Sequence, residues 1–314
     1  MRPSIFLRPF LVALLAFAIA TGASAASPGA PTDPAIAEGV RLHDAGEYEK
    51  AIAKYKEALA RDPENAKALY EMAMSYEARR DYVSAMQAAE AGLRLASPLK
   101  PSFYMLIGNI RDEQGDAPGA IAAYQAGLRE KPDMPLLHLN LGVAFLRQQS
   151  WKDGRRALEQ ALVLRPAHAS AHKYLALAYE QEGFKVPALL ALTRFLLLDP
   201  APDRAKDALG AMDRLFGIGF ERDSSTGNVT LTVDPDGSNE EGNFRSAELG
   251  MLLARAGSEL KDPPASEEPA RPPLVRRLWD ALAIAAETGD VEPHGFASRC
   301  YIPYFAALHA AGQL

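Results

Sequence analysis

Two histidines in the middle of the chain have a spacing that suits a metal ion. His168 and His172 are four residues apart, so one helix would bring both rings to the same face. A zinc hydrolase motif also needs a glutamate directly after the first histidine, and Ala169 stands there instead. His138 lies 34 residues before His172 in a similar local sequence. Packing alone therefore explains the His172 ring, and we predict no metal site here.

Three residues near the carboxy terminus have the side chains of a nucleophilic enzyme. Cys300, His294 and Asp290 are close in the sequence and could act as nucleophile, base and orienting group. They surround a Gly/Pro loop that matches no family pattern, and Cys300 precedes an apolar run. We therefore predict that Cys300 is a small buried thiol. As the single cysteine of the chain, it forms no internal disulfide.

One acidic loop has the alternating oxygen ligands that calcium uses. Asp234, Asp236, Ser238 and Glu240 are spaced two apart. The loop lacks both the glycine after the third ligand and the glutamate at loop position twelve. We therefore predict an ordinary polar loop.

Other short motifs give weaker evidence of function. Gly217 and Gly219 lack the third glycine of a dinucleotide loop and follow a predicted helix rather than a strand. Asn228 begins an Asn-Val-Thr sequon, which has meaning only in a eukaryotic secretory pathway. The sequence contains neither a Walker loop nor a serine elbow. We therefore predict neither catalytic residues nor a cofactor.

The first 25 residues are typical of a signal peptide. Arg2 and Arg8 precede an apolar run over residues 11–20, and small residues follow up to Ala25. The apolar run is about half of what a membrane-spanning helix needs. We predict cleavage after Ala25, a flexible leader over residues 26–34 and export, most simply to the periplasm, with secretion as the alternative.

Composition limits the kinds of partner. The chain has 314 residues, 48% hydrophobic and 24% charged, which excludes wholesale disorder. Its 34 basic and 40 acidic residues give a net charge of −6. Cleavage would remove two arginines and make it −8. This charge argues against a nucleic-acid groove and against binding to anionic membranes.

A period of 34 residues organises the middle of the chain. Pro63, Pro132, Pro166 and Pro200 follow similar endings, and the gaps between them are 69, 34 and 34 residues. In the unit between the first two, Ser97 stands at the proline position. Four further features recur in step with the prolines. They are a small residue (Gly39, Ala73, Gly108, Gly142, Ala176), a residue three later (Leu42, Tyr76, Arg111, Phe145, Tyr179), a turn (Gly46, Arg80, Gly115, Gln149, Gly183) and the start of a second apolar stretch (Ala51, Ala85, Ala120, Gly154, Ala188).

Each unit has the pattern of two amphipathic helices joined by a short turn. Ala51, Ile52, Tyr55, Ala58 and Leu59, for example, lie on one helical face. This pattern resembles the tetratricopeptide repeat, with small-x-x-aromatic in the first helix and Ala-x-x-x-aromatic in the second. The resemblance implies five repeats over residues 35–201 in an all-α, α-α superhelix.

We expect a different organisation after the repeats. Residues 202–217 carry an apolar stripe of Ala205, Ala208, Leu209, Met212, Leu215 and Phe216, which predicts a helix capping the solenoid. Residues 218–314 predict a small, mostly helical module. It begins with one short β-hairpin around residues 218–233 and continues with helices at 246–260 and 274–288. In the first of these helices, Leu249, Leu252, Leu253 and Ala256 should be buried. An apolar run at residues 301–311 ends the chain.

The resemblance also implies a binding groove lined by the first helices. Carried over to this chain, positions one and four after each small residue, with neighbours on that face, form the groove. They are Tyr70, Met74, Glu77, Met105, Asn109, Asp112, Leu139, Val143, Leu146, Lys173, Leu177 and Glu180. Asn109 matches the polar residue that holds a peptide backbone or carboxylate in some relatives. The basic partners that a carboxylate would need are missing, so we expect an apolar peptide or helix with basic residues.

The hypothesis from the sequence is an exported scaffold or adaptor that binds a protein segment in this groove. Two alternatives come from other classes. In one, the final module is an enzyme or metal-binding unit that the repeats position; in the other, the solenoid self-associates. The protein's own tail, residues 301–311, could also fill the groove.

Overall fold

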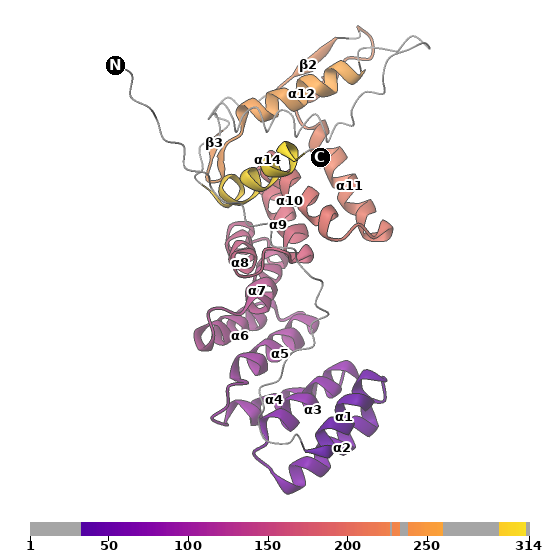
Figure 1. The fold of residues 1–314 in the computed structure, drawn as a ribbon, viewed down its shortest axis with the longest axis vertical. Coiled ribbons are helices and arrows are strands. Elements are labelled where there is room, and N and C mark those ends of the chain that lie inside the picture. The colour runs from indigo at the N-terminus through magenta and orange to yellow at the C-terminus, as the bar shows by residue number, and fades with distance from the viewer. Residues whose placement is uncertain (1–32, 227, 233–237, 260–294, 312–314) are drawn as a thin grey trace, which may run out of the picture.

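The computed structural model describes residues 33–226, 228–232, 238–259 and 295–311. The first eleven helices stack one after another along the long axis of the molecule, and the carboxy-terminal elements gather at one end (Figure 1). The sequence predicts this all-α architecture and one of its two short β-hairpins.

Between residues 33 and 201, where every residue is described, the chain forms five helical hairpins. Their helices are α1 (Pro34–Asp44) with α2 (Tyr48–Arg61), α3 (Ala66–Ala78) with α4 (Tyr82–Leu93), α5 (Lys100–Glu113) with α6 (Ala117–Glu130), α7 (Pro135–Arg147) with α8 (Trp151–Leu164), and α9 (Ala169–Gln181) with α10 (Lys185–Leu198). Each helix packs on the next, and each first helix also contacts the first helix of the following repeat. The surface made by α1, α3, α5, α7 and α9 is called the first-helix face below.

Local side-chain chemistry determines where several helices begin. The carboxylate of Asp116 accepts a hydrogen bond from the backbone N–H of Gly119 (2.9 Å), and the amide oxygen of Asn65 accepts one from Ala68 (3.0 Å). Such bonds satisfy backbone donors that a helix leaves unpaired in its first turn. A capping side chain of this kind begins α1, α3, α4 and α6, all of them in the first three repeats.

The turn between the two helices uses a left-handed residue in every repeat. Gly46, Gly115 and Gly183 have φ of 76°, 80° and 81°. Arg80 (60°) and Gln149 (58°) take the same conformation at the equivalent positions. Glycine adopts this conformation without steric cost, whereas arginine and glutamine do not. All five predicted turn positions are confirmed.

The small residues allow the helices of a hairpin to approach closely. A Cβ on Gly39 would lie 2.4 Å from Tyr55 Cε1, and one on Gly142 would lie 2.7 Å from Leu158 Cγ. The predicted register of the repeats is therefore confirmed by the contacts within each hairpin.

The helix predicted for residues 202–217 is α11 (Pro202–Gly217), which packs on α10. Ala208, Met212, Leu215 and Phe216 are buried as predicted. Leu209 was placed on the same stripe, but it is 53% exposed because only one side of α11 meets α10.

The predicted hairpin is formed by β1 (Phe220–Arg222) and β2 (Val229–Leu231), which pair antiparallel. A second, shorter pair lies in the segment that the sequence predicted to be a loop. It joins β3 (Ser238–Asn239) to β4 (Gly242–Asn243). Its strands are two residues each, too short to show an alternating pattern.

The helix predicted at residues 246–260 is α12 (Arg245–Glu259), but its buried face differs from the prediction. Ala247, Met251 and Leu252 are buried, whereas Leu249 and Leu253 are 43% and 55% exposed. Helix α12 contacts α10, α11, β1 and β2, and these contacts select the face with Ala247 and Met251. The side chain of Ala256 and the helix predicted at 274–288 lie outside the described residues.

Helix α10 is the centre of the largest core. Ten of its residues are buried, including Lys185 and every residue from Val186 to Thr193. Its contacts are with α9, α11, α12 and the π-helical turn η1 (Ala297–Tyr301), which continues into α14 (Ile302–Ala310). A helix that is apolar all round must be covered on every side.

Among the described residues, no helix is both long and apolar enough to cross a membrane.

Polar contacts join the carboxy-terminal elements to the fourth and fifth repeats. Arg155 on α8, 3% exposed, donates hydrogen bonds to Glu182 (2.8 Å), Glu159 (3.1 Å), Glu240 (2.7 Å) and Glu241 (2.7 Å). The other oxygen of Glu241 accepts bonds from the Tyr179 hydroxyl (3.1 Å) and the backbone N–H of Ala297 (2.8 Å). We name Arg155, Glu159, Tyr179, Glu182, Glu240 and Glu241 the Arg155 cluster. It links α8 and α9 to the β3–β4 turn and to η1.

Candidate functional site

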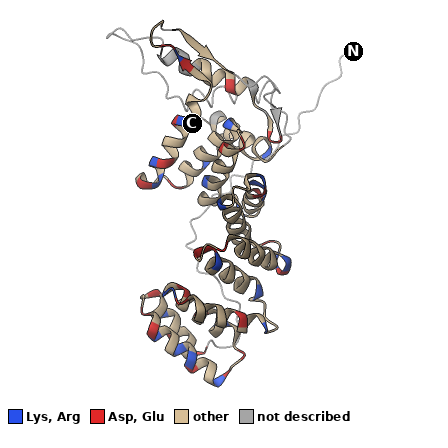
Figure 2. Ribbon diagram, turned by 180° about the vertical axis from the view of Figure 1, so that it is seen from behind, with Lys and Arg blue, Asp and Glu red and all other residues tan. Residues whose placement is uncertain are grey.

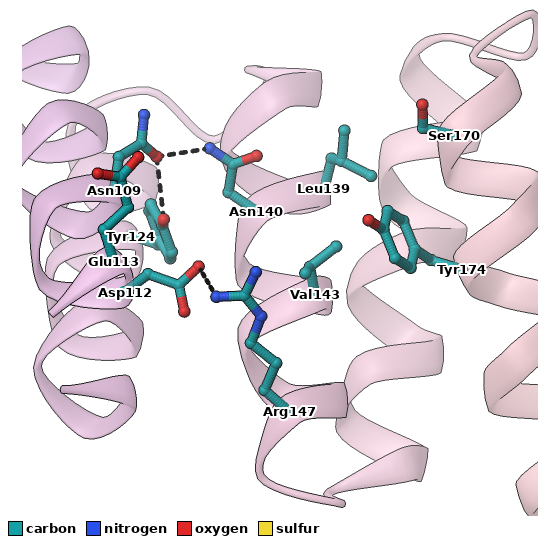
Figure 3. Close-up of a pocket in the computed structure, with 10 residues that line it drawn as sticks. All are labelled: Asn109, Asp112, Glu113, Tyr124, Leu139, Asn140, Val143, Arg147, Ser170 and Tyr174. Carbon is teal, nitrogen blue, oxygen red and sulfur yellow. Dashed lines mark hydrogen bonds and ion pairs between the residues drawn. The ribbon is translucent and has the colours of Figure 1, made fainter. Parts of the chain in front are cut away.

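A pocket of about 390 Å³ opens on the first-helix face between α5, α7 and α9. Leu139 and Val143 of α7 form its apolar floor, as Figure 3 shows between the polar groups of α5 and α9. The other lining residues are Asn109, Asp112, Glu113, Tyr124, Asn140, Arg147, Ser170 and Tyr174. Two aliphatic side chains therefore lie among polar and charged ones, and the lining as a whole is mainly polar.

Two amides from neighbouring repeats meet at this pocket. Asn109 Oδ1 accepts hydrogen bonds from Asn140 Nδ2 (2.9 Å) and from the Tyr124 hydroxyl (3.0 Å), as Figure 3 shows. Both bonds use the same oxygen. Within the described chain, the Asn109 amino group and the Asn140 carbonyl oxygen have no hydrogen-bond partner. The pair therefore leaves the Asn109 amino group and the Asn140 carbonyl oxygen available to a ligand, and their shared hydrogen bond holds both amides in place.

The charges at this pocket are partly neutralised. Arg147 of α7 forms an ion pair with Asp112 of α5 at 2.6 Å. Glu113 accepts a hydrogen bond from the Tyr82 hydroxyl at 2.7 Å. Burial and the negative charge of Glu113 raise the pKa of Glu77 on α3 to about 7. The uncompensated negative charge on this face therefore lies between α3 and α5, at Glu77 and Glu113.

The predicted groove residues of α3, and Met105 of α5, lie outside the pocket. Tyr70 packs edge-on against Phe103, with ring centroids 5.5 Å apart. Met74 is half-buried in the same core cluster. Met105 packs against the cluster that contains Ala120 and Tyr124. These side chains pack between repeats and also form part of the surface.

The predicted groove residues of α7 and α9 divide into four groups. Leu139 and Val143 line the pocket, whereas Leu146 is 6% exposed and contacts Gly154 of α8 within its own hairpin. Lys173 lies 4.0 Å from Asp207, and Glu180 lies 3.5 Å from Arg214, both on α11. Leu177 is 39% exposed. Helix α11 therefore extends the first-helix face by one helix and neutralises Glu180.

Six pocket residues were not predicted: Glu113, Tyr124, Asn140, Arg147, Ser170 and Tyr174. Asn140 and Tyr174 stand two residues before the small residue of their helix, and Glu113 and Arg147 stand five after it. Counted from the small residue, positions −2 and +1 are three residues apart and positions +1 and +5 are four apart. All three positions therefore lie on one face of the helix. A groove prediction that included positions −2 and +5 would have identified four of the six missed pocket residues.

The histidine pair does not form a metal site. His172 Nε2 lies 2.9 Å from the Pro166 carbonyl oxygen, and Nδ1 lies 2.7 Å from the Tyr301 hydroxyl. Both ring nitrogens are therefore occupied. His138 Nε2 makes the equivalent bond to the Pro132 carbonyl oxygen at 2.7 Å. Among the described residues, no cluster of three or more His, Cys, Asp or Glu side chains is arranged to hold a metal ion.

The remaining chemical candidates receive little support. Cys300 is exposed, which corrects the prediction of a buried thiol, because the π-helical turn η1 directs it to the surface. Asp290 and His294 lie outside the described residues, as do Asp234 and Asp236 of the acidic loop. The side chain of Glu240 is used in ion pairs with Arg155 and Lys152.

The described part of the tail does not occupy the pocket on the first-helix face. Tyr301 and the helix α14 after it pack in the core cluster around α10, on the far side of α9 from α5. The residues that line the pocket all come from α5, α6, α7 and α9. The ribbon in Figure 2 shows acidic and basic residues interspersed along the helices.

The fold defines a helical-repeat solenoid whose first helices form one face, and this pocket opens on that face. A family model described as "TPR repeat" matches residues 39–78 and 108–149, and one described as "Tetratricopeptide repeat" matches residues 139–205. The chain therefore carries tetratricopeptide repeats, and these repeats support a role as a protein–protein interaction scaffold.

Comparisons with individual proteins give short or distant similarities. The peroxisomal targeting signal receptor of Saccharomyces cerevisiae is 34% identical over 76 residues, and the BBSome complex member BBS4 homolog of Drosophila melanogaster is 24% identical over 133 residues. These segments cover 24% and 42% of this chain but 12% and 27% of the two relatives, so the chain spans a minor part of each.

Two solved structures have a similar arrangement of helices. The crystal structure of MamA has a TM-score of 0.47 and 20% sequence identity, covering 56% of this chain and 99% of the other. The crystal structure of YrrB, titled a TPR protein with an unusual peptide-binding site, has a TM-score of 0.46 and 19% identity, covering 57% and 92%.

Proposed function

We propose that the first-helix face binds an extended peptide segment of a partner protein in the pocket between α5, α7 and α9. The Asn109–Asn140 pair carries the proposal. A residue in an extended peptide presents its own N–H and C=O to the same side. The Asn140 carbonyl oxygen can accept from that N–H, and the Asn109 amino group can donate to that C=O. Because Asn140 and Tyr124 both hold Asn109 in place, little side-chain entropy is lost when a ligand binds.

The neighbouring groups suggest which peptide is preferred. Leu139 and Val143 would accept an apolar side chain of the ligand. Arg147 is already paired with Asp112, so a free terminal carboxylate lacks an available cation at this pocket. Glu77 and Glu113 repel each other, and a basic ligand side chain would relieve this repulsion. We therefore propose an internal peptide segment with an apolar anchor followed or preceded by Lys or Arg.

A selection experiment tests this proposal. A phage-displayed peptide library is panned against the full chain, and the enriched peptides are synthesised and measured by fluorescence anisotropy. Asn140→Ala should weaken binding about tenfold, because it removes the free acceptor while the Tyr124–Asn109 bond remains. The matched control is Gln125→Ala, an amide lost from the exposed surface of α6, which should leave binding unchanged.

Two outcomes would reject the peptide-binding site. One is that the enriched peptides bind Asn140→Ala and the parent chain equally well. The other is that they show neither apolar anchors nor basic residues. The relative named a peroxisomal targeting signal receptor is a binding protein by its name, which agrees with the class of function proposed but not with any particular ligand.

We also propose that the protein works after export, in the periplasm. The support is the pattern of residues 1–25, which lie outside the described residues: two arginines, an apolar run and a small-residue site at Ala25. Cell fractionation and mass spectrometry of the natural amino terminus test it. Export predicts a mature chain beginning at Ala26, and Ala25→Asp should block processing. A cytoplasmic protein that retains Met1 would contradict export.

A further inference from the structure

A second pocket, of about 380 Å³, lies where the carboxy-terminal helices meet the fourth and fifth repeats. Leu162 and Val163 near the end of α8 and Phe296 beside η1 supply apolar walls. The aromatic rings of Tyr301 and Tyr304 complete the lining on the other side. The volume falls within the range of about 300–1,000 Å³ that small-molecule sites have. It is separate from the peptide pocket, which is lined by α5, α6, α7 and α9.

Arg194 of α10 places a positive charge at this apolar pocket. Its guanidinium carbon lies 4.0 Å from the centroid of the Tyr304 ring, and Nη1 donates a hydrogen bond to the Tyr304 hydroxyl. These contacts hold the guanidinium group in place. No ion pair connects Arg194 to a carboxylate in the part of the chain that the structure describes. The charge is therefore available to a ligand.

The other polar groups of the lining are neutral near pH 7. Burial lowers the pKa of His172 to about 4, and its two nitrogens are already bonded to Pro166 and Tyr301. Cys300 is exposed at the mouth of the pocket, but the partial burial of its thiol raises the pKa of that group. The carboxylates of Glu159 and Glu241 lie behind Tyr301, but both are paired with Arg155. The pocket is therefore an apolar cavity with a single cation.

The turn η1 gives this cavity its shape. It is a π-helical turn over Ala297–Tyr301, and it brings Cys300 and Tyr301 to the pocket together. Turns of this kind are rare and occur frequently at functional sites. A regular α-helical turn would have one residue fewer and would rotate these side chains.

We propose that this pocket binds a small amphipathic carboxylate. Its hydrocarbon or aromatic body lies against Leu162, Val163 and Phe296, and its carboxylate pairs with Arg194. A guanidinium group pairs with a carboxylate through two parallel hydrogen bonds, which is stronger than a bond between neutral groups. This activity is additional to peptide binding and does not depend on it.

Cys300 is the single cysteine of the chain, so it reports on this pocket. The full chain is alkylated with iodoacetamide in the presence of octanoate, 1-octanol or octylammonium, and the rate of Cys300 modification is measured by mass spectrometry. Octanoate should slow the reaction in a saturable way. 1-Octanol, which lacks the charge, should need about tenfold higher concentration for the same protection, and octylammonium should need more still.

Variants of Arg194 test whether this residue is responsible for the protection of Cys300 by octanoate. Arg194→Gln should raise the octanoate concentration for half protection about tenfold. Arg194→Lys keeps the charge but loses the paired hydrogen bonds and the stacking on Tyr304, so its value should lie between those of the parent chain and Arg194→Gln. Arg129→Gln, on the exposed surface of α6, is the matched control and should behave as the parent chain. Absence of protection by octanoate, or equal protection by octanoate and 1-octanol in the parent chain, would overturn the proposal. Octanoate protection that is unchanged in a folded Arg194→Gln would also overturn it.

Discussion

The ring of Tyr124 lies directly against the backbone of Gly108, so that a Cβ on the glycine would be 2.3 Å from Cε1 of the tyrosine. The two residues are 16 apart in the sequence, and the same spacing joins Gly39 to Tyr55 and Gly142 to Leu158. This contact fixes the distance between the two helices of a repeat. Tyr124 also donates the hydrogen bond that positions Asn109, so the packing of the hairpin and the geometry of the pocket depend on one side chain.

Replacing Gly108 therefore tests both packing and register. Gly108→Ala should destabilise the protein by about 1–3 kcal/mol, because the added methyl group displaces a buried ring. Gly210→Ala is the matched control, since nothing lies within 4 Å of a Cβ at that helical position of α11. The control should be neutral or stabilising by about 0.5–1 kcal/mol. Urea unfolding measures both, and equal stabilities for the two variants would contradict the packing described here.

The left-handed turn residues predict a stabilising substitution. Gln149 has a φ of 58° at a position where three other repeats have glycine. Gln149→Gly should stabilise the protein by about 1 kcal/mol, because the strain of a left-handed side-chain residue is removed. The reverse change, Gly115→Gln, should destabilise the protein by a similar amount. The space around Gly115 is open, so the cost comes only from the left-handed backbone conformation that glutamine must adopt there. Thermal melts that shift in the same direction for both variants would contradict this explanation.

The Arg155 cluster predicts how the carboxy-terminal elements are attached. Arg155→Met should cost about 3–5 kcal/mol, because it leaves carboxylates buried without their cation. Arg156→Met, at the adjacent exposed position, should change stability by less than about 0.5 kcal/mol. Limited proteolysis should cut Arg155→Met after residue 238 before it cuts the repeats. If both variants resist proteolysis equally, the cluster does not hold these elements.

Glu159 predicts a pH dependence of stability. Burial, followed by the charge of Glu241, raises its pKa to about 7, although Arg155 opposes the shift. Because the folded pKa is above that of the unfolded chain, the protonated group favours folding. Its contribution is fully present below about pH 4.5 and is lost as pH rises through about 7.

The variant Glu159→Gln isolates this effect. It keeps an oxygen that accepts from Arg155 but does not ionise. The gain in stability over the parent chain should therefore be larger at pH 8 than at pH 5. Chemical denaturation at both pH values measures the difference. A gain that is the same at both would show that Glu159 does not titrate in this range.

The sequence predicted the repeats well because their signals are local. A fixed stride of 34 residues, small residues opposite aromatic rings and five turn positions all concern side chains within one hairpin or its neighbour. Helix α10, buried from Lys185 to Thr193, was predicted only as the second helix of its repeat, because the repeat pattern does not show which later elements cover it.

The candidate site was predictable only in part. Asn109, Asp112, Leu139 and Val143 were identified and line the pocket, but Arg147 was not, and it neutralises Asp112. Glu180, predicted as a groove residue, is likewise paired with Arg214 of α11. The charge of a groove depends on contacts between helices of different repeats, so a pattern within one helix does not reveal it.

The sequence by itself determined the solenoid, since each helix pair is specified by its own residues and needs only adjacent pairs to be buried. The tertiary structure alone decided how the final module attaches. Glu240 and Glu241 reach Arg155 across 85 and 86 residues, and Tyr301 reaches His172 across 129. These contacts depend on where a separately folded segment comes to lie, and neither periodicity nor local preference encodes such a position.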